Sequence, residues 1–375
     1  MKFVLWLLRI VVGALFIFSG MIKANDPLGL SYKMNEFFEV WHMPGLASWS
    51  LTLSVLMIGF EIIAGIALLL GAAFRIFSFL LLLLTLFFTF LTAYVYLTDK
   101  IKECGCFGDC IKISNAETFW KDVVLTVLVL ILFAYRKRIK PVFNKPTTTV
   151  LMTLTVIFAF WVQWYTLGNL PYYDCLPYKK GANIWEKMQP PPGSTKDVFK
   201  TVMTYEKDGV KKQFDETNYP WEDSTWKFVN SESVLVQKGN ADPVIKDFVI
   251  SDRDGNDQTQ QILQEKGYTF FLFIKDPKAA HTANLDRIRN LATIANQLNI
   301  PFYVLCSAGQ TEADAFMKQH HLEAAQWMIL DGTVSKTAMR SNPGLMLLKD
   351  GTIIEKWSYR NYPAKIALNN NTLVY

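Results

Sequence analysis

The sequence has no C-x-x-C pair, although it carries 5 cysteines in 375 residues. That spacing is the usual one for a catalytic dithiol, so a dithiol site of the common type is excluded. The 4 histidines never form H-E-x-x-H, and neither G-x-S-x-G nor a Walker motif occurs. The common signatures of zinc, serine and nucleotide hydrolases are therefore missing. No stripe of basic and aromatic residues accompanies the net charge of +5, so we predict no nucleic-acid partner.

Long apolar runs fill residues 1–167, whereas charged residues concentrate in 168–375. A helix needs about 20 mainly apolar residues to cross a bilayer. Five segments are candidate spans, the fourth being the shortest: Phe3–Ile22, Ala47–Ala73, Ile76–Leu97, Phe119–Tyr135 and Val150–Leu167. Arg9 interrupts the first run and no A-x-A pattern follows it, so this run predicts a retained anchor rather than a signal peptide.

Positive charges near the span ends predict the orientation. Lys2 and Arg9 lie at the first span, Arg75 lies between the second and third, and a basic cluster, 136–145, follows the fourth. If the spans alternate, these groups share one side of the bilayer, which we assign to the cytoplasm. Three lysines in the loop 98–118 oppose this assignment but are outweighed. That loop and everything after Leu167 are then predicted to face outward.

Cys104, Cys106 and Cys110 lie together in the outer loop, and Cys175 follows the fifth span at about the same membrane surface. Disulfides persist in an oxidising compartment. Three interpretations stay open for Cys104, Cys106 and Cys110: redox-active thiols, members of a structural disulfide, or ligands of a metal. A Cys104–Cys106 bridge would be strained, whereas Cys106 and Cys110 can pair with each other or either can pair with Cys175. With no histidine nearby, zinc has little support, and we predict no metal.

Among the ionisable residues inside predicted spans, Glu61 lies near the middle of the second span and Arg9 lies within the first. A carboxyl near the middle of a span costs roughly 2.5–3.5 kcal/mol on insertion scales and marks a functional site by default. Glu61 is predicted either to handle protons or to form a structural contact between helices, with Arg9 as its expected partner. A polar stripe at helical spacing on the third span predicts hydrogen bonds between helices; it consists of Thr85, Thr89, Thr92 and Tyr96.

The string Cys104-Gly105-Cys106-Phe107-Gly108, with Asp122 at the start of the next helix, resembles the MauE-type branch of the DoxX family of four-helix membrane proteins. The resemblance covers roughly residues 1–140 and includes a helix pattern of Leu8-Arg9-Ile10, Gly13, Phe16, Ser19-Gly20, Lys23, Glu61, Gly65 and Gly71. It implies extracytoplasmic thiol chemistry and maturation of disulfide-containing partners. An architectural similarity to vitamin K epoxide reductase implies a quinone as electron acceptor.

The outer half begins with a tether, 168–190, that ends in a stiff Pro-Pro-Pro-Gly sequence at Gly193. Asp208-Gly209 predicts a hairpin between strands 199–207 and 210–214. From Tyr268 onward strands and helices alternate, which predicts a mixed sheet with helices on its faces. The expected strands are 268–274, 301–306, 326–330, 345–348 and 352–357, and the expected helices are 285–298 and 311–319.

Residues 245–365 resemble the thioredoxin fold in this order, and Pro343 stands where that family has a cis-proline. Related extracytoplasmic domains read D-P-x-C-x-x-C after the strand. Here Ala279 and Thr282 occupy the two cysteine positions. Without a thiolate this site cannot exchange disulfides, so the resemblance implies a module that docks an extracytoplasmic protein partner. Cys306, in an apolar strand, is predicted to be buried.

The sequence therefore predicts an α-helical membrane bundle followed by an α/β thioredoxin-like domain. The predicted parts are a four-helix DoxX/MauE-like domain (1–140), a fifth span with its tether (141–193) and an extracytoplasmic domain (194–375) that is thioredoxin-like from about 245. The predicted role is accessory thiol–disulfide exchange, or maturation of envelope proteins, at the bacterial cytoplasmic membrane. The alternative is a non-enzymatic scaffold or subunit of an envelope complex with structural disulfides.

Overall fold

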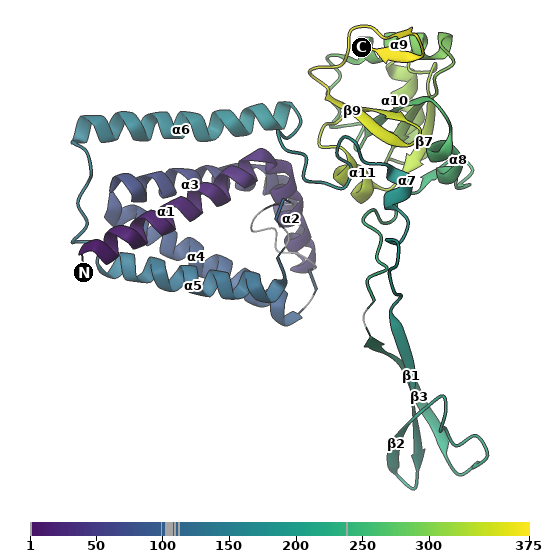
Figure 1. Cartoon of the computed structure of the whole chain (residues 1–375), viewed down its shortest axis with the longest axis horizontal. Coiled ribbons are helices and arrows are strands. Elements are labelled where there is room, and N and C mark those ends of the chain that lie inside the picture. Colours follow the sequence, from purple (N-terminus) through teal and green to yellow (C-terminus); the bar gives the residue numbers. More distant parts are fainter. Residues whose placement is uncertain (1, 99, 102–107, 109, 112, 238) are drawn as a thin grey trace.

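Figure 1 shows the computed structural model, which consists of a helical bundle, an α/β domain and a projecting β-sheet. The structure describes residues 2–98, 100–101, 108, 110–111, 113–237 and 239–375. The helices of the bundle region are α1 (Lys2–Asn25), α2 (Pro27–Val40), the short 3-10 helix Pro44–Trp49, α3 (Ser50–Leu70), α4 (Phe74–Thr98), α5 (Asn115–Ala134) and α6 (Lys145–Gly168).

Four helical segments in the described residues are long and apolar enough to cross a membrane: Lys2–Asn25, Pro44–Leu70, Phe74–Thr98 and Lys145–Gly168. They coincide with four of the five predicted spans, so the membrane assignment of this half is confirmed. Helix α5 covers the remaining predicted span but is not among them, because Glu117, Lys121 and Asp122 near its start shorten its apolar stretch. The fourth predicted span, Phe119–Tyr135, therefore stays a prediction.

Within the bundle, α1 packs along α3, and α4 packs along α5 (Figure 1). Two glycines bring α1 and α3 close together, since a Cβ added to Gly65 would lie 2.8 Å from the carbonyl oxygen of Gly13. Small residues allow this approach of backbones where helix association in lipid depends on close packing. Helix α6 lies on the outside of the bundle, where Phe160 contacts α3 at Gly59.

Helix α2, which the sequence pattern did not predict, lies across the end of the bundle nearest the α/β domain (Figure 1). The carboxylate of Asp26 caps it by accepting a hydrogen bond of 3.0 Å from the Gly29 backbone, and Pro27 occupies the first turn. An acidic cap followed by proline is a favourable start for a helix.

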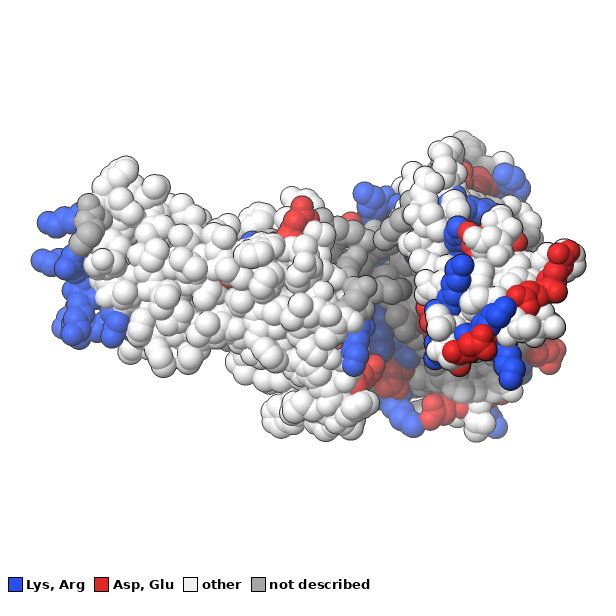
Figure 2. Space-filling model, turned by 90° about the horizontal axis from the view of Figure 1, so that it is seen from below, with Lys and Arg blue, Asp and Glu red and all other residues white. Residues whose placement is uncertain are grey.

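The start of α1, the α3–α4 turn and the α5–α6 connection meet at the opposite end of the bundle, where the Val142 backbone donates to the Leu70 carbonyl at 2.9 Å. Figure 2 shows Lys and Arg gathered at that end, beyond a body free of surface charge over most of its length. Its exposed basic residues are Lys2, Arg75, Lys137, Arg138, Lys140 and Lys145. The basic groups therefore share one end, as predicted; its assignment to the cytoplasm stays a prediction.

The α/β domain contains one mixed sheet in the order β4-β7-β6-β5-β8-β9. Strands β5, β6 and β7 are parallel neighbours, while β4, β8 and β9 pair antiparallel. The strands are β4 (Ile250–Ser251), β5 (Tyr268–Ile274), β6 (Phe302–Cys306), β7 (Gln326–Leu330), β8 (Gly344–Lys349) and β9 (Thr352–Ser358). Five of them fall where the sequence predicts strands, and β4 was missed.

Helices cover both faces of this sheet, which confirms the predicted mixed α/β arrangement. Apolar residues of α9 (Leu285–Gln297) and α10 (Gln310–Gln319) pack on one face with Cys306, which is buried as expected. Residues of α7 (Ile184–Lys187), α8 (Thr259–Gln264) and α11 (Gly332–Ala338) pack on the other. Two short strands, β10 (Ala367–Asn369) and β11 (Thr372–Val374), follow near the C-terminus.

A separate three-stranded antiparallel sheet projects away from both bodies (Figure 1). It contains β1 (Val198–Lys207), β2 (Val210–Asp215) and β3 (Lys227–Gln237), in the order β2-β1-β3. Asp208 and Gly209 both have positive φ, the backbone that a tight hairpin turn of the favoured type requires. The hairpin is confirmed, and β3 was missed.

Vesicles of opposite orientation test the arrangement of the two ends. We call the projecting sheet of β1, β2 and β3 the arm. We expect trypsin to cut the connection 136–145 only in inside-out vesicles, and to cut the arm at the exposed residues Lys211 and Lys212 only in right-side-out vesicles. The reason is that these sites lie beyond opposite ends of the bundle. Mass spectrometry of the peptides reads the result. Cutting of both sites in the same vesicle population contradicts the assignment.

Candidate functional site

The structure holds a disulfide between Cys110 and Cys175, one of the pairings that the sequence left open. The two Cα atoms lie 4.8 Å apart, and the bond joins the cysteine loop to the tether beyond α6. Cys104 and Cys106 lie outside the described residues. Because Cys110 is bonded to Cys175, the alternative Cys106–Cys110 bridge is absent from this arrangement of the chain.

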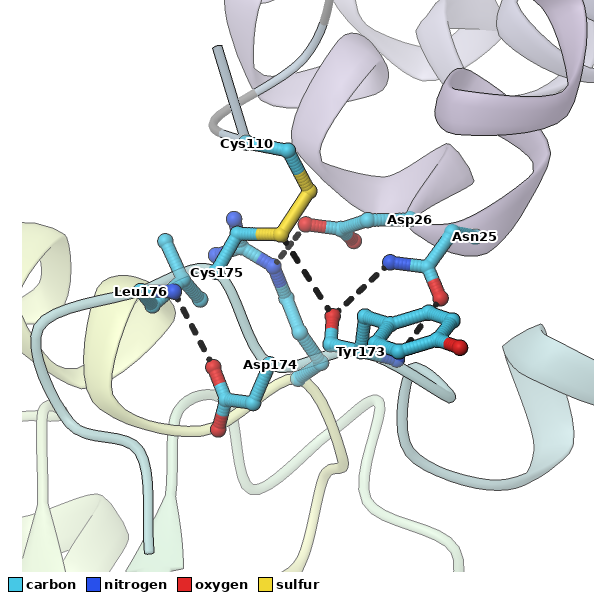
Figure 3. The surroundings of a disulfide bond; sticks show 8 residues. Asn25, Asp26, Cys110, Tyr173, Asp174, Cys175 and Leu176 are labelled. Atoms are coloured by element: carbon cyan, nitrogen blue, oxygen red, sulfur yellow. Dashed lines mark hydrogen bonds and ion pairs between the residues drawn. A yellow bond between two sulfur atoms is a disulfide. The ribbon is translucent and has the colours of Figure 1, made fainter. Parts of the chain in front are cut away.

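The tether around the disulfide is fixed from two further sides (Figure 3). Asn25, at the end of α1, exchanges two hydrogen bonds with the Tyr173 backbone, at 2.9 and 3.0 Å. Asp174 pairs with Lys356 of β9 at 2.6 Å. Burial lowers the pKa of Lys356 and the Asp174 carboxylate opposes that shift. The tether thus connects the helical bundle, the cysteine loop and the sheet at one point.

The α/β domain contacts the bundle beside this disulfide. Arg340 pairs with the cap residue Asp26 at 2.7 Å, and their side chains are only 6% and 17% exposed. The Lys275 ammonium donates to the Tyr32 hydroxyl of α2 at 3.2 Å and to the Arg340 carbonyl at 3.1 Å. Arg340 and Lys336 also lie over the Tyr32 ring. We call this contact the latch.

The edge of the α/β domain that forms the latch carries the residues predicted from the thioredoxin resemblance. Ala279 and Thr282 are exposed, and the Asn342–Pro343 peptide bond is cis, as the resemblance implies. The Asn342 backbone carbonyl accepts from the His281 backbone at 2.9 Å. Its side-chain amide bonds to backbone groups of Lys275 and Asp276. The polar groups of Asn342 are therefore engaged within the chain itself.

A buried ion pair connects α1 and α3. The Lys23 ammonium lies 2.5 Å from Oε1 of Glu61, and the side chains are 3% and 0% exposed. Lys23 also lies over the Phe88 ring of α4, 5.0 Å from its centroid. The expected pairing of Glu61 with Arg9 is wrong, since Lys23, about four turns further along the same face of α1, reaches the carboxylate instead.

Arg9 has a different role at the basic end of the bundle. Its guanidinium donates to the carbonyls of Leu68 (2.5 Å), Leu69 and Lys140 (3.3 Å). The last carbonyls of a helix have no partner within that helix, so Arg9 caps the C-terminal end of α3. In the predicted polar stripe, Thr89 does bond across helices, to Thr126 of α5 at 2.9 Å, whereas Thr92 bonds within α4.

A pocket of about 350 Å³ lies beside the Lys23–Glu61 pair, between α1, α4 and α5. The resemblance implies a quinone, and the aromatic walls of this pocket with the Lys23 ammonium suit a quinone ring; the residues that would hold it are Phe16, Phe88, Trp120 and Lys23. A bound quinone would supply an acceptor for two electrons. Within the residues that the structure describes, no three His, Cys, Asp or Glu side chains group as metal ligands.

Residues 1–135 match the family model for methylamine utilisation protein MauE. This region is a MauE-family membrane domain. A second family model, a domain of unknown function (DUF8463), matches residues 199–238, which form the arm. No curated protein matches the chain. The expected MauE resemblance is therefore confirmed for residues 1–135. No family model assigns the thioredoxin-like residues 245–365.

Several residues at this site were not predicted from the sequence. Lys23 was named only as part of the family pattern, with no partner predicted for it, and Asp26 and Tyr32 were not named as site residues. A proline after Asp26 is the one local signal that indicates a helix start there. Arg340 and Lys275 gave no signal, because their partners lie more than 200 residues away.

Removing one member of the Lys23–Glu61 pair tests its contribution to the MauE domain. Lys23→Met leaves a carboxylate without its cation and should cost up to about 3–5 kcal/mol of stability. The double variant Lys23→Met with Glu61→Met should regain most of this loss, since two apolar groups replace a complete pair. Thermal unfolding of the full chain in one detergent measures both. A double variant as unstable as the single one contradicts the assignment.

The latch should depend on pH through Lys275. Burial first, and then Arg340 and Lys336, lower the pKa of this ammonium to about 7 from 10.5, while Asp26 opposes the shift. Between pH 7 and 10.5, Lys275 therefore binds fewer protons when the latch is closed than when it is open. The closed latch should become more stable as pH rises through that window. Burial raises the pKa of Tyr32 to about 12, so its hydroxyl stays protonated there.

Hydrogen exchange of the α2 amides, corrected for the intrinsic rate, measures this effect between pH 7 and 9.5. Lys275→Met should remove the slope. Lys278→Met is the matched control, because Lys278 is 79% exposed and pairs with Glu312 away from the latch. A slope that persists in Lys275→Met, or a protection that falls as pH rises, contradicts the prediction.

Proposed function

We propose that this chain is a membrane accessory protein for thiol–disulfide exchange, or for maturation of envelope proteins, on the extracytoplasmic side of a bacterial cytoplasmic membrane. The observation that carries the proposal is the Cys110–Cys175 disulfide, which shares a loop with Cys104 and Cys106 and lies beside the latch. A single structural disulfide needs two cysteines, whereas the cysteine loop and the tether together carry four.

The exchange proceeds with a reduced client protein. A client thiolate attacks one sulfur of the Cys110–Cys175 bond, which breaks to form a mixed disulfide and a free thiolate. The second client thiolate then resolves the mixed disulfide. The client leaves with a new disulfide, and Cys110 and Cys175 take up two electrons and two protons as thiols. Reoxidation of Cys110 and Cys175 requires a disulfide as the electron acceptor, and Cys104 and Cys106, when paired as a disulfide, are the candidates for that role.

The α/β domain acts in this proposal as a thioredoxin-like docking module without redox chemistry of its own. The strand order of its sheet and the cis bond before Pro343 support that relationship. Ala279 and Thr282 leave it without a nucleophile. Its former active-site edge contacts the MauE domain through the latch, so its first docking partner is this chain. A protein client is the second partner.

A scaffold role is the second candidate, and one observation favours it. The tether that carries Cys175 is also bound by Asn25 and Lys356, so the disulfide adds a covalent fastening to a point that is already fixed. In that case Cys110–Cys175 is structural, and the chain supports an envelope complex without catalysis.

Thiol trapping in intact membranes separates the two functions. For the exchange function we expect acid quenching of membranes with the unmodified chain to capture a mixed disulfide between a client and Cys110 or Cys175, and Cys175→Ser to lose it, because that variant has no Cys110–Cys175 bond for a client to attack. Alkylation followed by mass spectrometry identifies the bonded cysteines. Cys306→Ser is the control, because Cys306 is buried and free in the α/β core. If Cys104, Cys106, Cys110 and Cys175 stay in fixed bridges that resist mild reductant, and Cys106→Ser keeps full function, the exchange proposal fails.

A further inference from the structure

The basic end of the bundle contains an open cleft. It lies between the start of α1 and the connection from α5 to α6, and its volume is about 710 Å³. Its apolar wall is formed by Leu5, Trp6 and Ile139. The other described residues that line it are all cationic: Lys2, Arg9, Arg138 and Lys140. The cleft therefore combines concentrated positive charge with an apolar surface.

Hydrogen bonds hold the connection against the helix ends and so define the cleft. Arg9 is only 6% exposed, and it donates to the last carbonyls of α3 and, at 3.3 Å, to the carbonyl of Lys140. The Val142 backbone donates to the Leu70 carbonyl at 2.9 Å. Because the connection is bound to both α1 and α3, the cations of the cleft are held together rather than spread along a free loop.

The sequence around the cleft supplies no negative charge to balance these cations. No Asp or Glu occurs in residues 1–25, 62–98 or 123–173, and these ranges contain the start of α1, the α3–α4 turn and the α5–α6 connection, which meet at this end. Like charges that gather in one cleft repel each other. An anion from outside these segments would relieve that repulsion.

Aromatic side chains indicate that the cleft lies at the membrane–water boundary. Trp6 is 55% exposed, and the Arg138 guanidinium lies over the Tyr135 ring, 5.2 Å from its centroid. Trp and Tyr are enriched at the level of the lipid headgroups, which Lys and Arg side chains also reach. Leu7 and Val11, 47% and 39% exposed, present further apolar surface deeper along α1. A ligand at this depth can put an anionic group in the cleft and hydrocarbon against α1.

We propose that this cleft binds the phosphate headgroup of an anionic phospholipid from the adjacent leaflet. Arg138 and Lys140 donate to the phosphate oxygens, the partners that guanidinium and ammonium groups favour. The nitrogens of Arg9 already donate to carbonyls, so Arg9 contributes a fixed charge behind them. The inference is independent of the proposed thiol exchange, because the cleft lies at the end of the bundle opposite the Cys110–Cys175 bond.

Two lipids that differ only in their headgroup test the proposal on the unmodified chain. Native mass spectrometry of the full-length protein in dodecyl maltoside is titrated with dioleoyl phosphatidylglycerol or with dioleoyl phosphatidylcholine, whose headgroup has no net charge. We expect saturable binding of phosphatidylglycerol that is at least about tenfold tighter, since each Lys or Arg at a membrane surface contributes roughly a factor of five toward an anionic lipid. Equal affinities overturn the proposal.

Inorganic phosphate, added at constant ionic strength, distinguishes a lipid from a free anion. A lipid gains from the apolar surface of α1 as well as from the cations, so phosphate should leave the binding of phosphatidylglycerol unchanged. Displacement of the lipid by phosphate means that the cleft takes a soluble anion, which also overturns the proposal.

Two double variants of the connection locate the binding. Arg138→Gln with Lys140→Gln removes two cations of the cleft and should lower the affinity for phosphatidylglycerol at least about tenfold. Arg136→Gln with Lys137→Gln is the matched control, because it removes the same charge from residues that do not line the cleft, and it should leave the affinity unchanged. Unfolding temperatures establish that both variants are folded. Equal losses in the two variants reflect only the net charge of this end and overturn the assignment to the cleft.

Discussion

The carboxylate of Asp26 makes contacts in both halves of this protein at once. Its Oδ1 caps α2, and its Oδ2 accepts from Arg340 of the α/β domain at 2.7 Å. Both side chains are largely excluded from water, so the pair is less weakened by solvent and salt than an exposed one. Losing Asp26 would remove both the cap of α2 and an anionic partner of Arg340. The contact between α2 and the α/β domain therefore depends on this residue together with the Lys275–Tyr32 hydrogen bond.

Inside the bilayer the constraint is different, because hydrocarbon offers no partner for a polar group. The MauE domain meets it by pairing polar groups between helices. Arg9 takes the carbonyls that end α3, Thr89 bonds to Thr126, and Lys23 neutralises Glu61. Oε2 of Glu61 departs from this rule.

Local pattern predicted most of the secondary structure. The strand at Tyr268–Ile274 matched its predicted bounds because a buried central strand is a continuous apolar run bounded by turn residues. Strand β3 was missed because it is exposed along its whole length, so no alternation of apolar and polar residues marks it. Helix α2 was missed because it is too polar for a span and lies across the end of the bundle.

The pairings at the site were not predictable in the same way. Asp26 and Arg340 are 314 positions apart, and Lys23 and Glu61 are 38 apart. Periodicity places a residue on a face of its own element but does not identify the residue opposite. Arg9 and Lys23 both stand in α1, and only the relative shift of α1 and α3 decides which of them reaches Glu61. That shift follows from the close contact at Gly13 and Gly65, which is a property of two helices together.

The latch also explains why a thioredoxin-like edge can function without cysteines. Lys275 and Arg340 of this edge engage Tyr32 and Asp26, and the Asn342 carbonyl accepts from the His281 backbone, so the edge is docked on α2 of the same chain. If the proposed exchange operates, clients approach the Cys110–Cys175 bond from the sides that the α/β domain leaves uncovered or when the latch opens. The lowered pKa of Lys275 predicts a weaker latch at lower pH, which favours the second route.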